Sequence, residues 1–597
     1  MKKNIIFLGV FILIACSSVI QRQRIVTNIS LTLAPDQRNE LLKSLKEKDK
    51  RYDVNAKMLQ TYNPPTTSHY HTYKIDTLVH GFRETSGYAL QLLDSDQPEN
   101  NARAIEVLDN LLRYQDTDPI SKTFGIWPYY LEEPLSEMPT PDWNWADFIG
   151  TNLIEINLSH KDKLPSELNK RLKHATICAA EAIKKRDVKP SYTNIAIMGT
   201  FVTYMTAELY NLSEMRTYAN NRLNRFYAHT LKLGGFEEYN SPTYSAVALD
   251  ELCRMKKCIT DPDAKKKLNE LYKIAWGVFA HHWHVTTAQL AGPHSRSYSD
   301  VLRKNFYTML YSGSSGRINI NQSGPALNAY RLPHQIPAEY IKQFTEIKGE
   351  TFRRDTFIMG DEGKAIVGTT LINPVFCLST VNHSQMWQQR RPLLAYWGTS
   401  EKPVFFQVKF LHDFVEFSSA NISSIQKQGN VLSEIRFDTN GGDYHIHLDR
   451  IDGTIKAKDL RLRFEFGDSS LVNQLKPAML NNLSIKTHHT ELNLKISILF
   501  AAFGSFKGHF EVGVEKGKSY IDWVAYSGNE KLFDFEKMNE AAMAFAISMG
   551  TANYPAGMDI ATAKATRKGN QLLVSWGDMG MKVPVRPGNT VEYLRWR

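Results

Sequence analysis

The sequence has 597 residues, of which 72 are Lys or Arg and 62 are Asp or Glu, so its formal net charge is +10. With 42% apolar and 22% charged residues, the composition excludes a mainly disordered chain, a collagen-like fibre and a coiled coil. The length exceeds what one compact core holds and predicts two or more domains. The basic balance indicates an anionic partner, which could be nucleic acid, a membrane surface or an acidic polysaccharide.

The N-terminus has the pattern of an export signal. Two lysines precede an apolar stretch, 4–14, that is too short to cross a bilayer. Residues 13–16, Leu-Ile-Ala-Cys, resemble a bacterial lipobox, in which the signal is cleaved before an acylated cysteine. We expect a lipoprotein signal peptide over 1–15, a lipid anchor at Cys16 and an N-terminal tether over 16–32. A plain secretory signal with an incidental cysteine is the alternative.

Export narrows the choice of partner. Removal of the signal peptide takes away two lysines and no acid, so the net charge of +10 falls to +8. A bacterial lipoprotein anchored in the periplasm or at the cell surface rarely meets nucleic acid, so we expect an acidic glycan or anionic lipid headgroups instead. The four cysteines after Cys16 are too few for disulfides to carry the fold, and their spacing is not that of a zinc site.

Helical patterns recur over 33–311. Apolar residues fall at i, i+3 and i+4, as at Ile197, Phe201 and Met205. So many helices with short links predict repeated hairpins, arranged as a solenoid or a closed (α/α) toroid, and the absence of a clean repeat period disfavours the solenoid. The predicted helices are 35–50, 72–94, 100–114, 145–159, 164–185, 193–210, 215–231, 242–257, 262–283 and 299–311.

The pattern changes after a linker expected over 312–354. Of the 34 glycines, 24 lie in 311–597. Apolar and polar residues alternate from about residue 355, strictly so in 460–466, Leu-Arg-Leu-Arg-Phe-Glu-Phe. We therefore predict a multidomain α and β fold. An N-terminal (α/α) toroid or barrel of helical hairpins, the catalytic domain, is followed by a C-terminal antiparallel β-sandwich over 355–597, with one helix at about 535–548.

Aromatic side chains gather in two loops of the helical half. Segment 127–134, WPYYLEEP, and segment 142–148, DWNWADF, mix aromatic with polar residues. Aromatic faces pack well on the C–H faces of sugar rings, so Trp143, Asn144 and Trp145 are candidate substrate-binding residues. Filling of gaps between helix ends is the alternative.

Segment 234–245, GGFEEYNSPTYS, ends one predicted helix and begins the next. A Ser cap before Pro marks the new helix, which places Tyr244 in its first turn. The partial positive charge there favours an anionic substrate and a more acidic phenol. Glu238 and Tyr239 of the same segment are candidate substrate contacts. An ordinary helix start with a core tyrosine is the alternative.

Segment 291–300, AGPHSRSYSD, precedes another predicted helix. It places His294, Arg296 and Tyr298 at alternate positions, so a proton-transfer group, an anion clamp and a phenol share one loop. Capping of neighbouring helix ends is the alternative. Asn194 begins a further helix, where it is a good cap and could also donate to a ligand carboxylate.

In the sheet half, segment 382–392, NHSQMWQQRRP, leaves the end of a strand. Its His383 and Arg390 lie among amides, which suits a carboxylate-rich ligand, although a solvated turn fits equally well. The sequence contains no P-loop, GxGxxG, HExxH, GxSxG, EF-hand or zinc-type pattern. Phosphoryl transfer, nicotinamide chemistry and zinc hydrolysis therefore lack support.

The lipobox, the toroid, the sandwich and the Ser-Pro-x-Tyr start at 241–244 together resemble the heparinase/alginate-lyase-like polysaccharide lyases. More specifically, the chain is similar to the bacterial lyases that remove L-rhamnose α-1,4-linked to D-glucuronate on arabinogalactan proteins. The resemblance implies a carbon–oxygen lyase that cleaves at C4 of a uronic acid by β-elimination. Its partner would be an acidic oligo- or polysaccharide.

In that group an Asn neutralises the substrate carboxylate, a Tyr exchanges protons and a His assists. The resemblance assigns Asn194 to the first role, Tyr244 to the second, and His294 or His383 to the third. Ile195 and Ser245 stand where the group commonly has His, so the base stays open.

Neutralisation of the carboxylate would stabilise the enolate-like anion formed at C5. Arg296 and Asn194 are the expected donors, and a bound divalent cation such as calcium is the alternative. Two rival functions remain. One is a glycoside hydrolase on the same toroid, with Asp142 or Asp147 paired with Glu238. The other is a non-catalytic glycan-binding lipoprotein that uses its exposed aromatic residues.

Overall fold

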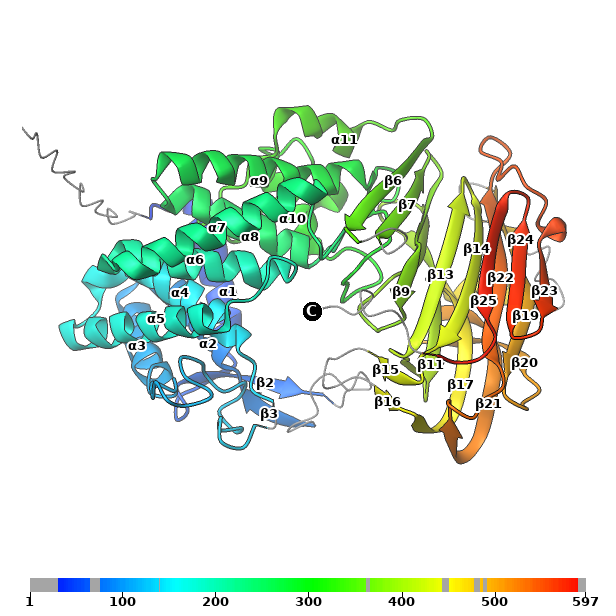
Figure 1. Cartoon of the computed structure of the whole chain (residues 1–597). Coiled ribbons are helices and arrows are strands. Elements are labelled where there is room, and N and C mark those ends of the chain that lie inside the picture. Colours follow the sequence, from blue (N-terminus) through cyan, green and yellow to red (C-terminus); the bar gives the residue numbers. More distant parts are fainter. Residues whose placement is uncertain are drawn as a thin grey trace, which may run out of the picture.

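The computed structural model describes residues 31–64, 76–138, 140–360, 365–442, 450–476, 484–486 and 491–588. The predicted signal peptide, Cys16 and nearly all of the predicted tether lie outside these residues. Within them, no helix is both long and apolar enough to cross a membrane. The chain divides into an N-terminal helical half and a C-terminal half of antiparallel sheets, which confirms the predicted fold class (Figure 1).

The helical half is an arc of hairpins. In the described part of the chain, α2, α4, α6 and α8 pack successively against one another as an inner row, and α3, α5, α7 and α9 each pack on the inner helix before them. The bounds are α1 (Pro35–Asp49), α2 (Phe82–Ser95), α3 (Pro98–Leu111), α4 (Asn144–His160), α5 (Ser166–Arg186), α6 (Thr193–Tyr210), α7 (Ser213–Leu233), α8 (Tyr244–Cys258), α9 (Pro262–His281), α10 (Lys304–Gly313) and α11 (Ile341–Thr345).

Burial explains the inner and outer rows. Residues 193–207 of α6 are all buried because this helix is enclosed by α4, α7 and α8. By contrast, α7 buries only one stripe, which includes Met215, Leu223 and Phe226. Since each inner helix is followed by an outer one that returns, the inner helices run in the same direction. Their N-termini therefore lie at one end of the arc, which faces the sheet half (Figure 1).

The predicted helix 72–94 is wrong in its first part. The strand β3 (Thr77–His80) pairs with β2 (Met58–Asn63), and β2 pairs with β1 (Tyr52–Asp53). Thr77 and Val79 are β-branched and favour a strand. Helix α2 begins only after Gly81, whose backbone is still extended.

Two sheets form the sandwich. Among the described residues, the first contains β6 (Thr351–Ile358), β7 (Ile366–Ile372), β8 (Phe376–Val381), β10 (Leu393–Gly398), β11 (Pro403–His412), β12 (Val415–Glu416), β17 (Thr454–Phe466), β20 (His509–Glu515) and β21 (Lys518–Asp534). The second contains β9 (His383–Gln385), β13 (Ala420–Lys427), β14 (Asn430–Phe437), β18 (Ser484–Lys486), β19 (Glu491–Phe503) and β22 (Ala541–Gly550). Apolar side chains of both sheets, among them Phe406, Phe464 and Phe545, form one core.

Shorter strands complete this half. The sheet β23 (Lys564–Lys568), β24 (Gln571–Trp576) and β25 (Met579–Pro584) covers the outer face of the second sheet. Two further pairs are β15 (Asn440–Gly442) with β16 (Arg450–Asp452), and β4 (Trp283–His284) with β5 (Gln289–Leu290). Strand β6 begins at Thr351, inside the range 312–354 expected for the linker.

The helix predicted at 535–548 is wrong, because strand β22 occupies most of that range. Its sequence, AAMAFAISMG, suits a helix by alanine content. In the structure both faces are buried: Met543, Phe545 and Ile547 enter the sandwich core, while the alanines at 542, 544 and 546 pack under the three-stranded sheet. Small side chains are needed on that second face because the covering sheet lies close. Tertiary packing therefore overrides helix propensity here.

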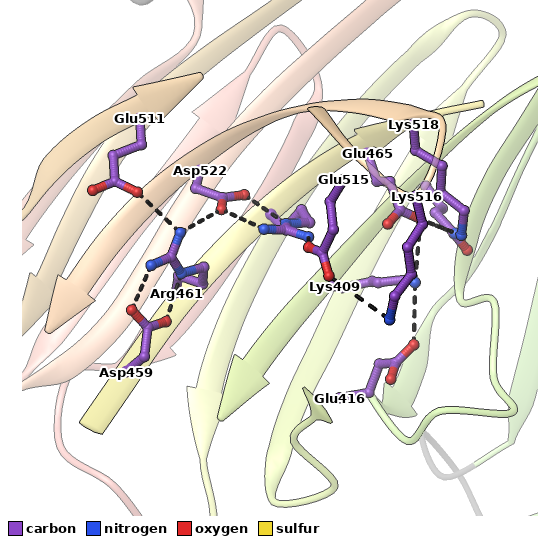
Figure 2. A network of polar contacts seen from close by, with 12 residues as sticks. Lys409, Glu416, Asp459, Arg461, Glu465, Glu511, Glu515, Lys516, Lys518 and Asp522 are labelled. Carbon is purple, nitrogen blue, oxygen red and sulfur yellow. Dashed lines mark hydrogen bonds and ion pairs between the residues drawn. The ribbon is translucent and has the colours of Figure 1, made fainter. Parts of the chain in front are cut away.

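The outer face of the first sheet carries a ladder of alternating charges (Figure 2). On β17, Arg461 and Arg463 point away from the core side chains Leu462 and Phe464. Asp522 on β21 accepts hydrogen bonds from both arginines. Figure 2 shows Arg461 also paired with Asp459 and Glu511. The ladder links β17 to β21. At its end Lys518 pairs with Asp300, in the loop between β5 and α10.

Candidate active site at the inner helix ends

The site lies where the N-termini of the inner helices meet two loops. One loop, 291–303, connects β5 to α10, and the other, 386–392, connects β9 to β10. The loops pair with each other: His294 N–H donates to Arg391 C=O at 3.1 Å and Ser297 N–H to Gln389 C=O at 2.6 Å. This pairing fixes the sheet half against the helix ends.

A phenol pair is the most exposed part of the site. The oxygens of Tyr244 and Tyr298 are 2.6 Å apart, and their rings meet edge to face. Tyr244 is the first residue of α8, and its N–H donates to Ser241 Oγ at 2.9 Å. Ser241 Oγ–H in turn donates to Arg296 C=O at 2.6 Å. The helix start and the loop are thereby held in register.

Arg296 contacts the phenol pair, and each of its guanidinium nitrogens donates a hydrogen bond to a protein group. Its Nε donates to Gln389 Oε1 at 2.7 Å, Nη1 to Glu238 Oε1 at 3.1 Å and Nη2 to Tyr244 Oη at 3.2 Å. The guanidinium is also sandwiched between the rings of Tyr244 and Trp387, each 4.7 Å away. Burial lowers the pKa of Arg296, but Tyr244 and Glu238 outweigh it and the pKa is raised. Arg296 therefore remains a cation.

Glu238 joins Arg296 to the start of α6. Its side chain is 1% exposed, and Oε2 accepts a hydrogen bond from Asn194 N–H at 3.1 Å. Burial raises the pKa of Glu238 to about 7, against the opposing effect of Arg296. Asn194 itself is buried, and its Oδ1 has no hydrogen-bond partner in the described chain. Asn194 Oδ1 is thus one of several buried polar atoms of the site without a partner in the described chain, with Gln389 Nε2 and His294 Nδ1.

The start of α4 approaches the same region. Asn144 Nδ2 donates to Tyr192 Oη at 3.1 Å, and Asn144 Oδ1 accepts from Arg186 at 2.7 Å. Burial raises the pKa of Tyr192 to about 12, so it remains a neutral phenol. Trp143, beside Asn144, is 38% exposed and donates its indole N–H to Lys122 C=O.

Two residues predicted to bind substrate are core residues. Trp145 is 5% exposed and stacks on Tyr129 with ring centroids 4.6 Å apart. Tyr239 is buried and stacks on Phe357 at 4.2 Å. Neither ring presents a face to a ligand, because a protein ring already covers it. The gap-filling interpretation holds for Trp145, and Trp143 is the exposed member of that segment.

The two histidines also lie apart from the phenol pair. His294 Nε2 contacts Leu290 C=O at 3.0 Å, and burial lowers its pKa to about 3. His383 Nδ1 contacts Ser423 Oγ at 2.8 Å, and burial lowers its pKa to about 4. Both are neutral, and neither contacts Tyr244 in the described structure. Both rings contact protein groups, and the expectation that one of them assists proton transfer stays a prediction.

Arg390 was the expected carboxylate ligand of the sheet half. It is buried, and its Nη1 donates to Ser384 Oγ at 3.4 Å. The neighbouring Trp387 and Gln389, which the sequence did not single out, contact Arg296 instead. The segment 382–392 was a correct signal for this loop, but sequence order alone does not show which of its side chains point inward.

The site does not fit a divalent cation. No group of three or more His, Cys, Asp or Glu side chains in the described chain is arranged to hold a metal ion. Phenols, an amide and a guanidinium dominate the site, whereas calcium takes six to eight oxygen ligands, with carboxylates prominent. The cation alternative therefore supplies no step of the mechanism below.

A family model matches most of the helical half of the chain. A domain of unknown function (DUF8769) matches residues 40–316. No curated protein matches the sequence.

Solved structures with a similar architecture share little sequence. A heparinase III, the BT4657 gene product, is 9% identical with a TM-score of 0.39, over 93% of this chain and 91% of that one. Chondroitin AC lyase of Streptomyces coelicolor A3, in complex with chondroitin sulphate, is 10% identical with a TM-score of 0.43, over 92% and 85%. Endoglucanase CelQ of Clostridium thermocellum is 9% identical with a TM-score of 0.23, over 88% and 93%.

Proposed function

We propose that the protein is a polysaccharide lyase that cleaves the bond at C4 of a uronic acid by β-elimination. The observation that carries the proposal is the phenol pair, Tyr244 and Tyr298, with oxygens 2.6 Å apart and a buried arginine donating to one of them. Elimination needs a base for the C5 proton and an acid for the leaving oxygen. Two phenols that share a hydrogen bond can supply both.

Charge distinguishes the two phenols. Arg296 donates to Tyr244 Oη, and its cation stabilises negative charge on that oxygen. Tyr244 as phenolate takes the C5 proton, and the electron pair of the C5–H bond forms the C4=C5 double bond. The C4–O bond breaks, and the leaving oxygen takes the proton of Tyr298. The proton then passes from Tyr244 to Tyr298 along their hydrogen bond, which restores the starting state.

The substrate carboxylate needs its own donor. Arg296 already donates once from each guanidinium nitrogen to a protein group, which leaves one N–H on Nη1 and one on Nη2. In this proposal Arg296 mainly positions Tyr244. The amide of Asn194 and the positive end of α6 are the remaining groups suited to offset the carboxylate charge.

The carboxylate pair of a hydrolase is poorly placed. Asp147 is buried against α6, where a Cβ on Gly199 would come within 2.6 Å of its Oδ1. Glu238 is buried with both oxygens accepting hydrogen bonds. Asp142 Oδ1 accepts from Asn144 N–H at the start of α4. A hydrolase needs two carboxyl groups that reach the scissile bond, so these contacts favour the lyase.

The finer substrate class rests on the sequence resemblance. We infer a glucuronate-containing glycan, such as rhamnose-capped arabinogalactan, bound by a lipoprotein that is anchored through Cys16 in the periplasm or at the cell surface. A Cys16→Ser variant should then move from the membrane fraction to the soluble fraction. Retention of that variant in the membrane would contradict the anchor.

Ultraviolet absorbance tests the proposed reaction, because the C4=C5 double bond conjugated to the carboxylate absorbs. The full-length protein should raise this absorbance with one or more glucuronate-containing glycans, and with rhamnose-capped arabinogalactan in particular. Inactivity on all uronate glycans, together with hydrolysis of a neutral glycan without absorbance, would overturn the proposal. Binding of glycans without turnover would favour the non-catalytic alternative.

A further inference from the structure

Arg83 is an exposed cation beside the phenol pair that no sequence pattern indicated. It lies in the first turn of α2, the inner helix at the start of the arc. Its guanidinium lies over the ring of Phe148, 3.6 Å from the centroid, and within 5.9 Å of the Trp145 ring. These cation–π contacts hold the side chain against α4, which carries both rings.

The position of Arg83 places it in the row of inner helix starts that forms the site. Helix α2 packs against α4, and α4 packs against α6, whose first turn carries Asn194. Desolvation lowers the pKa of Arg83, and Tyr129, Tyr244 and Tyr298 act in the opposite direction.

Arg83 lacks the partners that other arginines of this region have. Arg296 is bound by Glu238 and Gln389, and Arg186 donates to Asn144. The guanidinium of Arg83 forms no hydrogen bond and no ion pair with any described residue, and its contacts are with aromatic rings. A guanidinium that contacts only aromatic rings still has its N–H donors available for a planar anion. The side chain can therefore bind an anionic ligand.

We propose that Arg83 binds a second anionic group of the glycan, a carboxylate or sulfate on the sugar next to the one that is cleaved. The proposal rests on the lyase function above. It predicts that, among glucuronate-containing glycans, those with a second acidic group on the neighbouring sugar are cleaved better than rhamnose-capped arabinogalactan, whose neighbouring sugars are neutral. Trp143, which is 38% exposed at the start of α4, is the adjacent apolar surface for the ring that carries that group. Arg83 is thus a specificity-determining residue and takes no part in proton transfer.

The test compares substrates as well as variants. The probes are a glucuronate tetrasaccharide with all carboxylates intact, the same compound with the neighbouring carboxyl reduced to an alcohol, and a counterpart with a sulfate in its place. The full-length protein, its Arg83→Gln and Arg83→Lys variants, and the control Arg113→Gln are assayed for kcat and KM. Arg113 is also exposed but pairs with Asp109 on the outer helix α3.

Wild type and the control should prefer the doubly acidic probes. Arg83→Gln should lose about 10–100-fold in kcat/KM on those probes, mainly through KM, and should be unchanged on the carboxyl-reduced probe. Arg83→Lys should recover part of the loss, because it keeps the charge without the planar fork. A larger effect with the sulfated than with the carboxylated probe would identify sulfate as the ligand, and the reverse would identify the carboxylate.

Equal loss on all probes, or no loss on any, would overturn the role of Arg83. Calorimetric binding to the Tyr244→Phe background separates this result from the proposed chemistry. If wild type shows no elimination, yet binding of the acidic probes still depends on Arg83, the proposed reaction fails and the binding site stands. If elimination occurs without dependence on Arg83, the binding site fails and the reaction stands.

Discussion

Tyr244 and Tyr298 can each lose a hydroxyl without losing a ring, which makes the phenol pair directly testable. Tyr244→Phe and Tyr298→Phe should each lower kcat by about 10²–10⁴-fold with little change in KM, because a positioned acid or base contributes that much. Steady-state kinetics on a uronate glycan, with melting temperature as the check on folding, measures the effect.

Tyr227→Phe on the outer helix α7 is the matched control, because it loses only a hydrogen bond to Glu270. It should keep full activity. If either active-site variant retained wild-type kcat, that residue would not carry a proton in the reaction.

Glu238 should leave a signature in the pH dependence of stability. Its pKa is raised from 4.5 to about 7 in the fold, so the folded state binds the proton more tightly than the unfolded state. The stability that this protonation contributes is present below 4.5 and is lost as the pH rises towards 7. The melting temperature of Glu238→Gln, relative to wild type, should therefore increase with pH across this window.

The exposed Glu40→Gln variant on α1 provides the control and should show no such trend. A constant offset between Glu238→Gln and wild type from pH 4.5 to 7 would contradict the raised pKa.

At the scale of residues, the sequence predicted the segments that form the site better than the individual side chains that point into it. The segments 234–245 and 291–300 do meet in one site, since helix-start and loop patterns fix where a chain turns. Trp387 and Gln389 were missed because their inward direction depends on pairing between loops of different halves. Arg83 was missed because a lone arginine in a helix has no pattern of its own.

At the scale of elements, Asp300 anchors the loop that carries Arg296 and Tyr298. Its carboxylate accepts hydrogen bonds from Lys518, Gln407 and Arg391 on the sheet half, at the end of the charge ladder in Figure 2. Burial raises the pKa of Asp300, but Arg391 and the neighbouring lysines outweigh it, so the pKa lies well below its usual range.

Asp300→Asn should therefore destabilise the fold by roughly 1–3 kcal/mol, since it removes the acid of Arg391 and leaves Lys518 with Glu465 alone. The contribution is present above the unfolded pKa and is lost as the pH falls below it. Denaturant titration at neutral and acidic pH should show a difference from wild type that shrinks on acidification. The same variant should lower kcat, because the loop loses its anchor.

Glu530→Gln, on the same strand as Lys518 but with its weak ion pair to Lys456 at 4.0 Å, should leave both quantities unchanged. Equal stability of Asp300→Asn and wild type at neutral pH would show that the loop is held by its backbone pairing alone.

Elements were predicted well where one period dominates and poorly where packing decides. The strictly alternating segment 460–466 forms part of β17, and segment 193–210, with its apolar residues at i, i+3 and i+4, forms the inner helix α6. Strand β22 was predicted as a helix because its alanine content favours a helix. That content gives no indication of the three-stranded sheet that covers the strand. The start of α2 was predicted too early. The pairing of β3 with β2 joins two separate segments, and the pattern within 72–94 does not reveal it.

At the scale of the whole molecule, the division into helices and sheets creates the site. The inner helices present their N-termini together, and the sheet half closes over them through the loops 291–303 and 386–392. The net charge was compatible with an acidic ligand, but a single exposed arginine and the helix ends carry the specific argument. Most of the charged side chains lie elsewhere, and in the ladder of Figure 2 acids and bases are paired.

The central claim is that the bond is broken by elimination, so the most direct measurement is product analysis after digestion in heavy-oxygen water. Elimination should give an ultraviolet-absorbing product that contains no oxygen from the solvent and is lighter than the hydrolysis product by one water. A saturated product that carries one solvent oxygen would show hydrolysis and would contradict the account.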